Sequence, residues 1–563
     1  MIIKALKAFS DGVLSLHEGA IANVPDAKAE IYIRFGYAIE YTGEGGDITE
    51  ALNAFESSKI APNYERKSYN TMPTDEELVT MLGNNERVLF ETRGYYETYD
   101  GAGGLYCVTT DAVQGARKFV VNNTDYYLVP LDYNVSERVN VCRLGIRPYV
   151  KSSMTDVTIK ESYAEINSNY LKNIYKNGTP HDFILSFPAG RFYFKDTIDL
   201  TGYEMGIEGV EPARARDEIA NSGLFGGGTV LCFPFLADGK EAIKQDDGKI
   251  KNVLLIGSKQ NYDFSIDRTK LTTSPNEVIT EAIKKNDDNS DFTNTGIYKT
   301  GSGELTNVYV MHFWRGISAL AHNTYVNNVF AKRCHFGFAF GNDIKARGVY
   351  GWNVHTLLQV TGAIFSGVQI RVDSCVHAVQ ITTINGNNGS IGGVTLDDVD
   401  GDWCTDSLIK IGNDVNYIEA RNCAFSNIHG RCNILKYYSA SDTPPSASTL
   451  NTSNSAGYGI IRVGEKATFV NNRVSINTLG DSNVNDSATA QLLTPPILLT
   501  FGSGGNGVKG NMFTVSAPQI ATASDIADIL QFGSENGTSA RIDTAFNTYY
   551  VKGSTVTPVI AES

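Results

Sequence analysis

The chain lacks the features that mark a membrane, a disordered or a nucleic-acid-binding protein. None of its stretches reaches the roughly 18 consecutive apolar residues of a transmembrane helix, so we expect no such helix. Charged residues are only 20% of the 563 residues and hydrophobic residues are 42%, which excludes a disordered chain. The formal net charge of −14 gives no excess of positive charge, so we expect no nucleic-acid partner and no insertion into a membrane.

Cysteine pairs and a secretory leader are also missing. None of the eight cysteines lies in a CxxC pair, so we expect no metal, no cofactor and no disulfide framework. The N-terminal stretch MIIKALKAFSDGVLSLHEGA places Asp11 and Glu18 where a signal peptide would need an apolar run. We therefore expect synthesis in a cytoplasm, where the thiols stay reduced.

Proline is scarce as well, and what is abundant indicates β structure. The chain has 16 prolines but 54 glycines and 10% aromatic residues, a composition typical of an ordered, turn-rich β protein. Residues 1–45 resemble a small α/β module, and residues 46–150 combine a linker with a neck region of short helices and strands. Residues 151–563 begin with a helix pattern and continue as short apolar strands separated by Gly and Asn turns.

An internal repeat runs through this third region. Six short segments align so that apolar or small residues recur at the first, third and sixth positions, and successive starts are 20 to 24 residues apart. The aligned segments are VYVMHF (308–313), VFAKRC (329–334), VYGWNV (349–354), IRVDSC (370–375), VTLDDV (394–399) and IEARNC (418–423). A helix-free repeat of this length predicts an all-β parallel solenoid, in which stacked coils about 4.8 Å apart bury a continuous inner face.

Three further stretches carry a resemblance to a known family. They are RGYYETYDGAGGLYCV (93–108), VNVCRLGI (139–146), and a helix pattern over 157–176 that leads into ILSFPAGRFYF (184–194). On these stretches the chain resembles the bacteriophage tailspikes and capsular polysaccharide depolymerases of the right-handed parallel β-helix, pectate-lyase-like superfamily. One motif departs from the family pattern, because the Asp-rich stretch that precedes the first helix is reduced here to Asp156.

The resemblance implies both an assembly and an activity. It implies a right-handed parallel β-helix that forms a homotrimer, sits on the virion tail, and binds other phage tail or baseplate proteins through its N-terminal region. The protein would be made in the host bacterial cytoplasm and released by lysis. Its substrate would be a bacterial surface polysaccharide: a capsule, an exopolysaccharide or an O-antigen.

The outer face of the predicted coils is the candidate site. Side chains alternate along a strand, so the second and fourth positions of the six segments point outward and form one surface. The outward residues of its early coils are aromatic, and those of its later coils are charged. This combination suits a carbohydrate, because aromatic rings stack on sugar rings and arginines form bidentate hydrogen bonds with the carboxylates of acidic sugars. The expected substrate-binding residues are Tyr309, Lys332, Tyr350, Trp352, Arg371 and Arg421.

Three carboxylates on this surface are the candidate catalysts. In the predicted alignment Asp373 and Asp397 lie one coil apart, roughly 5 Å between their Cα atoms, so repulsion would favour a protonated carboxyl that can act as an acid. Asp397 and Glu419 lie diagonally, roughly 8 Å apart. Carboxyl separations of about 6.5–9.5 Å suit an inverting glycosidase, so we favour glycoside hydrolysis.

Other interpretations of these residues stay open. The charges could form a solvated face with ion pairs between Arg371 and Asp397 and between Asp373 and Arg421. A polysaccharide lyase could use Arg421 or Lys332 as the base on an acidic sugar. A receptor-binding spike without catalytic turnover could use the aromatic residues and arginines only to hold the glycan.

Two other groups of residues favour structural roles. Asp398, Asp400 and Asp402 alternate as calcium ligands could, but without a complete calcium loop they are more typical of a turn. The histidines near the coils have no partners at metal-ligand spacing, so we expect packing or turn roles for them. These histidines are His312, His335, His355 and His377.

Overall fold

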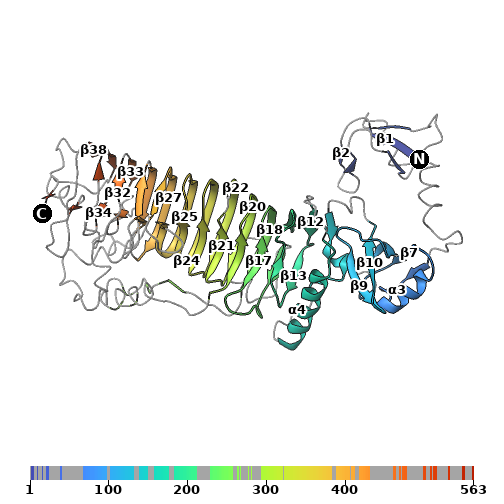
Figure 1. Cartoon of the computed structure of the whole chain (residues 1–563). Coiled ribbons are helices and arrows are strands. Elements are labelled where there is room, and N and C mark those ends of the chain that lie inside the picture. Colours follow the sequence, from blue (N-terminus) through green and yellow to red (C-terminus); the bar gives the residue numbers. More distant parts are fainter. Residues whose placement is uncertain are drawn as a thin grey trace.

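We describe the protein from a computed structural model of all 563 residues (Figure 1). Residues 67–431 are described most completely. The gaps within them are 98–101, 132–137, 150–156, 177–182, 212–227, most of 258–292, 383–388, 406–407, 412–417 and the single positions 321 and 422. Outside this range the structure describes short strands only.

A wound sheet of 23 strands, ordered as they follow in the chain, forms the long body of the molecule in Figure 1. Strands of successive coils pair in parallel, which confirms the predicted parallel β-solenoid. The first coils contain β11 (Arg138–Asn140), β12 (Phe183–Ser186), β13 (Gly190–Tyr193), β14 (Ile198–Asp199), β15 (Met205–Glu208), β16 (Thr229–Cys232), β17 (Glu241–Gln245), β18 (Gly248–Ile256) and β19 (Thr295–Lys299).

The rest of this sheet carries the candidate site and the C-terminal coils. Its middle strands are β20 (Gly303–Met311), β21 (Arg315–Ala319), β22 (Thr324–Lys332), β23 (Phe336–Phe340), β24 (Ile344–Val360), β25 (Ser366–Ile381), β27 (Thr395–Cys404), β28 (Ile409–Ile411) and β30 (Ala424–Arg431). Its last strands are β31 (Ile461–Val463), β33 (Arg473–Asn477), β34 (Leu499–Phe501), β36 (Met512–Ser516) and β38 (Thr548–Val551).

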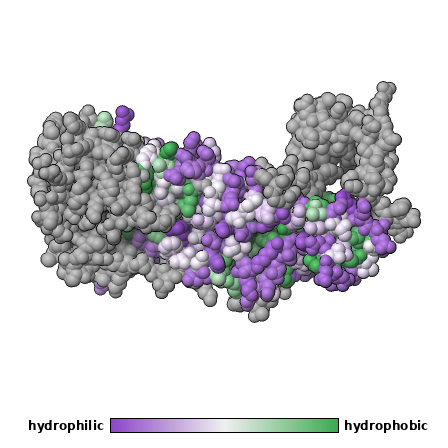
Figure 2. Space-filling model, viewed as in Figure 1, coloured by the Kyte–Doolittle hydropathy of each residue, from purple (hydrophilic) through white to green (hydrophobic). Residues whose placement is uncertain are grey.

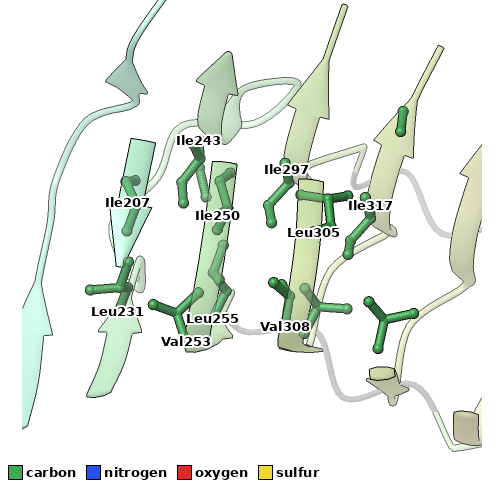
Figure 3. Close-up of a cluster of buried hydrophobic side chains, with 14 of the residues drawn as sticks. Ile207, Leu231, Ile243, Ile250, Val253, Leu255, Ile297, Leu305, Val308 and Ile317 are labelled. Atoms are coloured by element: carbon green, nitrogen blue, oxygen red, sulfur yellow. The ribbon is translucent and has the colours of Figure 1, made fainter. Parts of the chain in front are cut away.

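Stacked aliphatic side chains fill the lumen of the coils (Figure 3). Val308, Val329 and Val349 occupy the same place in three successive strands, and each is fully buried. A coil of about 20 residues cannot enclose a core by itself, so each coil is stabilised by burial against its neighbours. The side chains labelled in Figure 3 are Ile207, Leu231, Ile243, Ile250, Val253, Leu255, Ile297, Leu305, Val308 and Ile317.

The corners of the coils use residues with a left-handed backbone. Asn252, Asn307 and Asn328 stand immediately before the inward valines and have φ values of 57°, 53° and 52°. The Asn307 Nδ2 atom donates to Asn252 Oδ1 at 2.8 Å, and Asn328 Nδ2 donates to Asn307 Oδ1 at 2.7 Å. Asparagine tolerates this conformation better than most residues, so the ladder fixes the corner and the coil register together.

A helix lies at the N-terminal end of the solenoid. Helix α4 (Val157–Lys172) agrees with the predicted helix over 157–176 and contacts β13. Its buried Asn167 side chain donates to the carbonyl oxygens of Arg147 and Tyr193, at 3.1 Å each. The helix is thereby hydrogen-bonded to the first coil.

A small five-stranded sheet packs against this end. It contains β6 (Lys67–Tyr69), β7 (Arg87–Thr92), β8 (Gly104–Thr109), β9 (Arg117–Val121) and β10 (Thr124–Pro130), together with α3 (Asp75–Leu82); the short 3-10 helix η1 (Val141–Leu144) follows. The Arg117 guanidinium pairs with Asp75 at 2.6 Å and lies 5.2 Å from the Tyr170 ring centroid of α4. One continuous buried core joins the small sheet to the solenoid.

Shorter sheets complete the described structure. A three-stranded sheet and a hairpin near the N-terminus contain β1 (Ile2–Ala5), β2 (Phe9–Ser10), β3 (Ser15–Leu16), β4 (Ile21–Asn23) and β5 (Ala38–Glu40). A separate four-stranded sheet contains β26 (Gly389–Gly392), β29 (Ile418–Arg421), β32 (Thr468–Val470) and β35 (Val508–Lys509). The pair β37 (Gln531–Phe532) and β39 (Ala561–Glu562) lies near the C-terminus of the chain.

The predicted register holds for four repeats and is wrong for the last two. Ile370 pairs with Val399 rather than with the predicted Val394, and in the next coil this position is held by Ile428 rather than by the predicted Ile418. The coils lengthen here, from 21 residues between positions 349 and 370 to 29 between 370 and 399. The alignment is wrong here because segment 394–399 also has apolar residues at the first, third and sixth positions. Only the segment that starts at Val399 pairs in register with the strand of the preceding coil.

Candidate functional site

The corrected register defines the outer face that passes over the middle coils. Its strands keep the predicted aromatic residues in the early coils and bring different charged residues into the later coils. In the second position of each coil stand Tyr309, Phe330, Tyr350, Arg371, Asp400 and His429. In the fourth position stand Met311, Lys332, Trp352, Asp373, Asp402 and Arg431.

A surface pocket of about 270 Å³ lies on this face. Its aromatic and charged lining residues come from five successive strands, β20, β22, β24, β25 and β27. They are Tyr309, Phe330, Tyr350, Arg371, Asp373, Asp400 and Asp402, and Asn328, Gly351 and Val372 complete the lining. The predicted residues Tyr309, Tyr350, Arg371 and Asp373 are therefore brought together, as parts of one pocket.

Three carboxylates meet at one end of the pocket. Asp373 and Asp402 are direct neighbours in adjoining strands, so their Cα atoms lie roughly 4.8 Å apart. Asp400 precedes Asp402 by two residues on the same face, and its Cα lies roughly 8 Å from that of Asp373 along the diagonal. The Ser374 hydroxyl donates to Asp373 Oδ1 at 2.8 Å. All three carboxylates are partly exposed and can therefore contact a ligand.

The guanidinium of the pocket is already paired with a carboxylate. Arg371 Nη2 donates to both carboxylate oxygens of Asp398, at 3.1 and 3.4 Å. This hydrogen bond to Asp398 is the main cause that raises the pKa of Arg371, so the residue stays a cation under all ordinary conditions. Asp398 stands at a left-handed corner, with φ of 56°, in the place that Asn328 holds in an earlier coil.

Aromatic rings form the opposite end of the pocket. Tyr309 is 1% exposed and packs edge-on against Phe330, with ring centroids 6.1 Å apart. Phe330 and Tyr350 are half-buried, so parts of these two rings face solvent. A sugar can lay its apolar C–H face on such rings while its hydroxyl groups reach the carboxylates.

Lys332 and Trp352 form a separate pair beside the pocket. The Lys332 Nζ atom lies 4.0 Å from the centroid of the Trp352 ring, a cation–π contact, and the Lys332 side chain is fully buried. Trp352 is half-buried. Neither side chain lines the pocket, although both were predicted to bind substrate.

Several predicted neighbours are not neighbours in the structure. Asp397 pairs with Val368 and Ser426 rather than with Asp373, and it accepts hydrogen bonds from Ser426 Oγ at 2.7 Å and Asn427 Nδ2 at 2.8 Å. The predicted pairing of Asp373 with Asp397 is therefore wrong, and so is an ion pair of Arg371 with Asp397, because Asp398 takes that place.

Glu419 and Arg421 lie on a different sheet. Both belong to β29, which pairs with β26 and β32 outside the wound sheet of the pocket. The predicted diagonal between Asp397 and Glu419 and the predicted pair of Asp373 with Arg421 are wrong for this reason. The alignment failed because the longer coils contain an extra strand that a constant repeat length does not allow.

Two residues that the sequence interpretation left out of the site belong to it. Asp400 and Asp402 are typical turn residues by their sequence pattern, yet they line the pocket. The sequence does contain a pattern that places these two residues on the outer face. The segment VDGDWC (399–404) ends in Cys404, just as the preceding segment IRVDSC (370–375) ends in Cys375, and the two cysteines pair in register. The two sulfur atoms lie 3.1 Å apart in the lumen.

The histidines have packing and turn roles, as predicted. His335 is 4% exposed and stacks on His355 with ring centroids 4.4 Å apart. His312 stands at a left-handed corner with φ of 61°. Within the described residues, no group of three or more His, Cys, Asp or Glu side chains could hold a metal ion. No helix of the described part is long and apolar enough to cross a membrane.

Comparison with known proteins finds similar solved structures, whereas no family model and no curated protein matches. The structure is similar to a capsular polysaccharide depolymerase, the tailspike protein gp49 of Acinetobacter baumannii bacteriophage Fri1 (TM-score 0.35, 11% identity, 88% of this chain and 77% of that chain covered). It is also similar to the tailspike protein of another Acinetobacter phage (TM-score 0.32, 10% identity, coverage 87% and 71%).

A third similar structure comes from a bacterium. It is a glycan biofilm modifying enzyme of Pantoea stewartii with a bacteriophage tailspike-like parallel β-helix fold (TM-score 0.33, 12% identity, coverage 68% and 50%). The parallel solenoid of the present chain is established by its own strand pairing.

Proposed function

We propose that the protein is a tailspike-type depolymerase that hydrolyses a bacterial surface polysaccharide at this pocket. The observation that carries the proposal is the meeting of aromatic rings and three carboxylates in one pocket of about 270 Å³. The rings offer stacking faces for a sugar, and carboxylates are the groups that glycoside hydrolysis uses as acid and base. Substrate would lie across successive coils, with the scissile bond over β25 and β27.

The spacing of the carboxylates supports an inverting mechanism. The Cα atoms of Asp373 and Asp400 lie roughly 8 Å apart along the diagonal, and from there their side chains can hold the two carboxyl groups about 6.5–9.5 Å apart, which leaves room for a water molecule between them. In this assignment Asp373, assisted by its neighbour Asp402, protonates the leaving oxygen. Asp400 removes a proton from the water that attacks the sugar from the other side.

A lyase mechanism has less support from the placement of the basic residues. Lys332 is fully buried beside Trp352 and does not line the pocket. Arg421 belongs to the separate four-stranded sheet. Arg371, which does line the pocket, is held by Asp398 as a cation and cannot accept a proton.

The setting of the proposed activity follows from the family resemblance of the sequence. We infer a homotrimer on a virion tail, bound to other tail or baseplate proteins through the N-terminal region. Molar mass from light scattering tests the trimer: three times 61.3 kDa is expected, and a monomer would remove this part of the proposal.

The central experiment compares two substitutions that conserve shape. Purified protein is incubated with capsular and O-antigen polysaccharides, and new reducing ends are measured. Asp400→Asn is expected to lower the rate by about 100-fold or more, because Asp400 is the proposed general base and general acid–base groups contribute on that scale. Asp397→Asn is the matched control, since Asp397 lies outside the pocket lining, and its rate is expected to stay within a few-fold of the wild-type rate.

The same assay separates the alternatives. An unsaturated, ultraviolet-absorbing product would identify a lyase. Binding of glycan without any fall in its size would identify a spike without turnover. Loss of activity in Asp397→Asn together with full activity in Asp400→Asn would move the site back to the residue that the sequence alignment favoured.

A further inference from the structure

We infer that Cys375 and Cys404 form a redox modification site, at which a small oxidant joins the two lumen sulfur atoms in a disulfide between successive coils. The inference goes beyond the proposed function, because the bond requires neither a glycan nor catalysis. It follows from the position, the surroundings and the chemistry of the two thiols.

The two cysteines stand close enough to be bridged. Cys375 of β25 and Cys404 of β27 are direct register partners in adjoining parallel strands, so their Cα atoms lie roughly 4.8 Å apart. Disulfides in proteins span Cα separations of about 4.4–6.8 Å. The two sulfur atoms lie 3.1 Å apart, so an approach of about 1 Å brings them to the bonding distance of about 2.05 Å. The bond therefore forms without a change of strand register.

The lumen around the two sulfur atoms favours this pair over a pair with Cys334. The Cys404 sulfur fills space that Gly401 leaves open, since a Cβ atom on that glycine would lie 2.8 Å from the sulfur. Cys334 is also buried, but the coil that contains Val354 lies between it and Cys375. Two coil spacings amount to about 9.6 Å, which is beyond the reach of a disulfide.

The bond would link the strands that carry two of the pocket carboxylates. Asp373 precedes Cys375 by two residues, Asp402 precedes Cys404 by two, and the two aspartates are themselves register partners. A covalent bond in the lumen would therefore hold this outer-face pair together from the inside. It would also close a loop over the 29 positions that separate the two cysteines, and closing such a loop stabilises a fold by restricting its unfolded chain.

The chemistry calls for a small, uncharged oxidant such as hydrogen peroxide. One thiolate attacks a peroxide oxygen and becomes a sulfenic acid while the other oxygen leaves as water. The second sulfur then displaces the hydroxyl group as another water, so two thiols and one peroxide give one disulfide and two waters. Burial raises the pKa of the Cys375 thiol well above its usual value, so little thiolate is present and the reaction is expected to take hours. A reducing cytoplasm keeps such pairs as thiols, so in the proposed setting the bond would form after lysis.

The test oxidises the native, full-length protein and maps its disulfides. The protein is incubated with hydrogen peroxide, remaining thiols are blocked with iodoacetamide in urea, and the unreduced digest is analysed by mass spectrometry. We expect a linked peptide pair that contains Cys375 and Cys404, is absent before oxidation and is split by a reductant. The melting temperature of the oxidised protein is expected to rise by about 3 °C or more.

Two variants assign the effect to this pair. Cys404→Ala is expected to lose both the linked peptide and the gain in melting temperature, whereas Cys334→Ala, which changes a buried cysteine two coils away from Cys375, is expected to keep both. The peptide map of the wild-type protein decides without either variant, so a variant that fails to fold leaves the test intact.

Two results would overturn the inference. One is that both thiols stay free after prolonged oxidation of the native protein, and the other is that Cys375 is linked to a different cysteine. The depolymerase proposal is tested separately by the reducing-end assay, so the two can fail independently.

Discussion

Acidification is expected to destabilise the solenoid through one buried imidazole. His335 is 4% exposed, lies 4.4 Å from the ring of His355, and lies 6.1 Å from the parallel ring of Trp314. Burial is the main reason that the pKa of His335 falls from 6.5 to about 2, with smaller contributions from the charges of His355 and Arg315. The folded protein therefore keeps this ring neutral at any pH above about 2.

The sign and size of the effect follow from proton linkage. Between pH 6.5 and 2 the unfolded chain binds a proton on this histidine and the folded chain does not, so stability falls as the pH falls through that range. Each pH unit contributes about 1.4 kcal/mol. Two units below the unfolded pKa, at about pH 4.5, the loss is about 3 kcal/mol, a large part of the stability of a typical domain.

The assay is urea unfolding at pH 7 and 4.5, compared between variants. Burial acts to raise the pKa of Asp199, but hydrogen bonds from Thr201 outweigh it and lower the pKa below 3.8, so protonation of this carboxylate destabilises the fold mainly below pH 3.8. The comparison of variants at pH 7 and 4.5 therefore isolates the contribution of the histidine. His335→Phe keeps a stacking ring without a titratable group and is expected to lose about 3 kcal/mol less than the wild type.

The matched control replaces an exposed histidine. The His322 side chain is 66% exposed and contacts Asp343 on the surface, so His322→Gln is expected to leave the acid loss of stability nearly unchanged. If His335→Phe loses as much stability in acid as the wild type does, the buried neutral imidazole is not the cause.

Two further predictions test the corner ladder and the corrected register. Asn307→Ala removes two side-chain hydrogen bonds and places alanine at φ of 53°, so urea unfolding is expected to show a loss of about 2 kcal/mol. Asn327→Ala is the control, because Asn327 is exposed and lies next to the corner rather than at it, and its stability should change by less than about 0.5 kcal/mol. Equal losses in the two variants would argue against the ladder. Cys375 and Cys404 are buried, and burial raises the pKa of the Cys375 thiol well above its usual value. Mass spectrometry should therefore find both thiols unmodified by iodoacetamide in the native protein and modified in urea. Rapid labelling of Cys404 in the native protein would place it outside the lumen.

The sequence was sufficient to predict the solenoid and four of its coils. The residues at 308, 329, 349 and 370 pair as predicted because lumen positions tolerate only apolar or small side chains, which gives each coil a recognisable period. The helix over 157–176 was predictable from its pattern and is present as α4. These features depend on local periodicity alone.

The later coils were not predictable by the same argument. Period-two alternation is satisfied by more than one frame, and both Val394 and Val399 start an acceptable segment. What distinguishes the frames is the left-handed corner, where Asp398 replaces the asparagine, glycine or glutamine of earlier coils. Aspartate occurs at four of the six positions 397–402, so the sequence alone does not indicate that Asp398 is the corner residue, and the alignment stays ambiguous.

The position of the pocket follows from the change in coil length. The three coils between Val308 and Ile370 are 20 or 21 residues long, and the next is 29, although the lumen residues Ile370, Val399 and Ile428 remain in register. A solenoid constrains its inner positions tightly, whereas its corners accept insertions and its outer positions accept any polar residue. Catalytic carboxylates can therefore be introduced at the second and fourth positions of a strand without disturbing the core. The aromatic short coils and the acidic long coil meet where Asp373 faces Asp402, so a glycan crossing that boundary would contact stacking faces on one side and acid–base groups on the other.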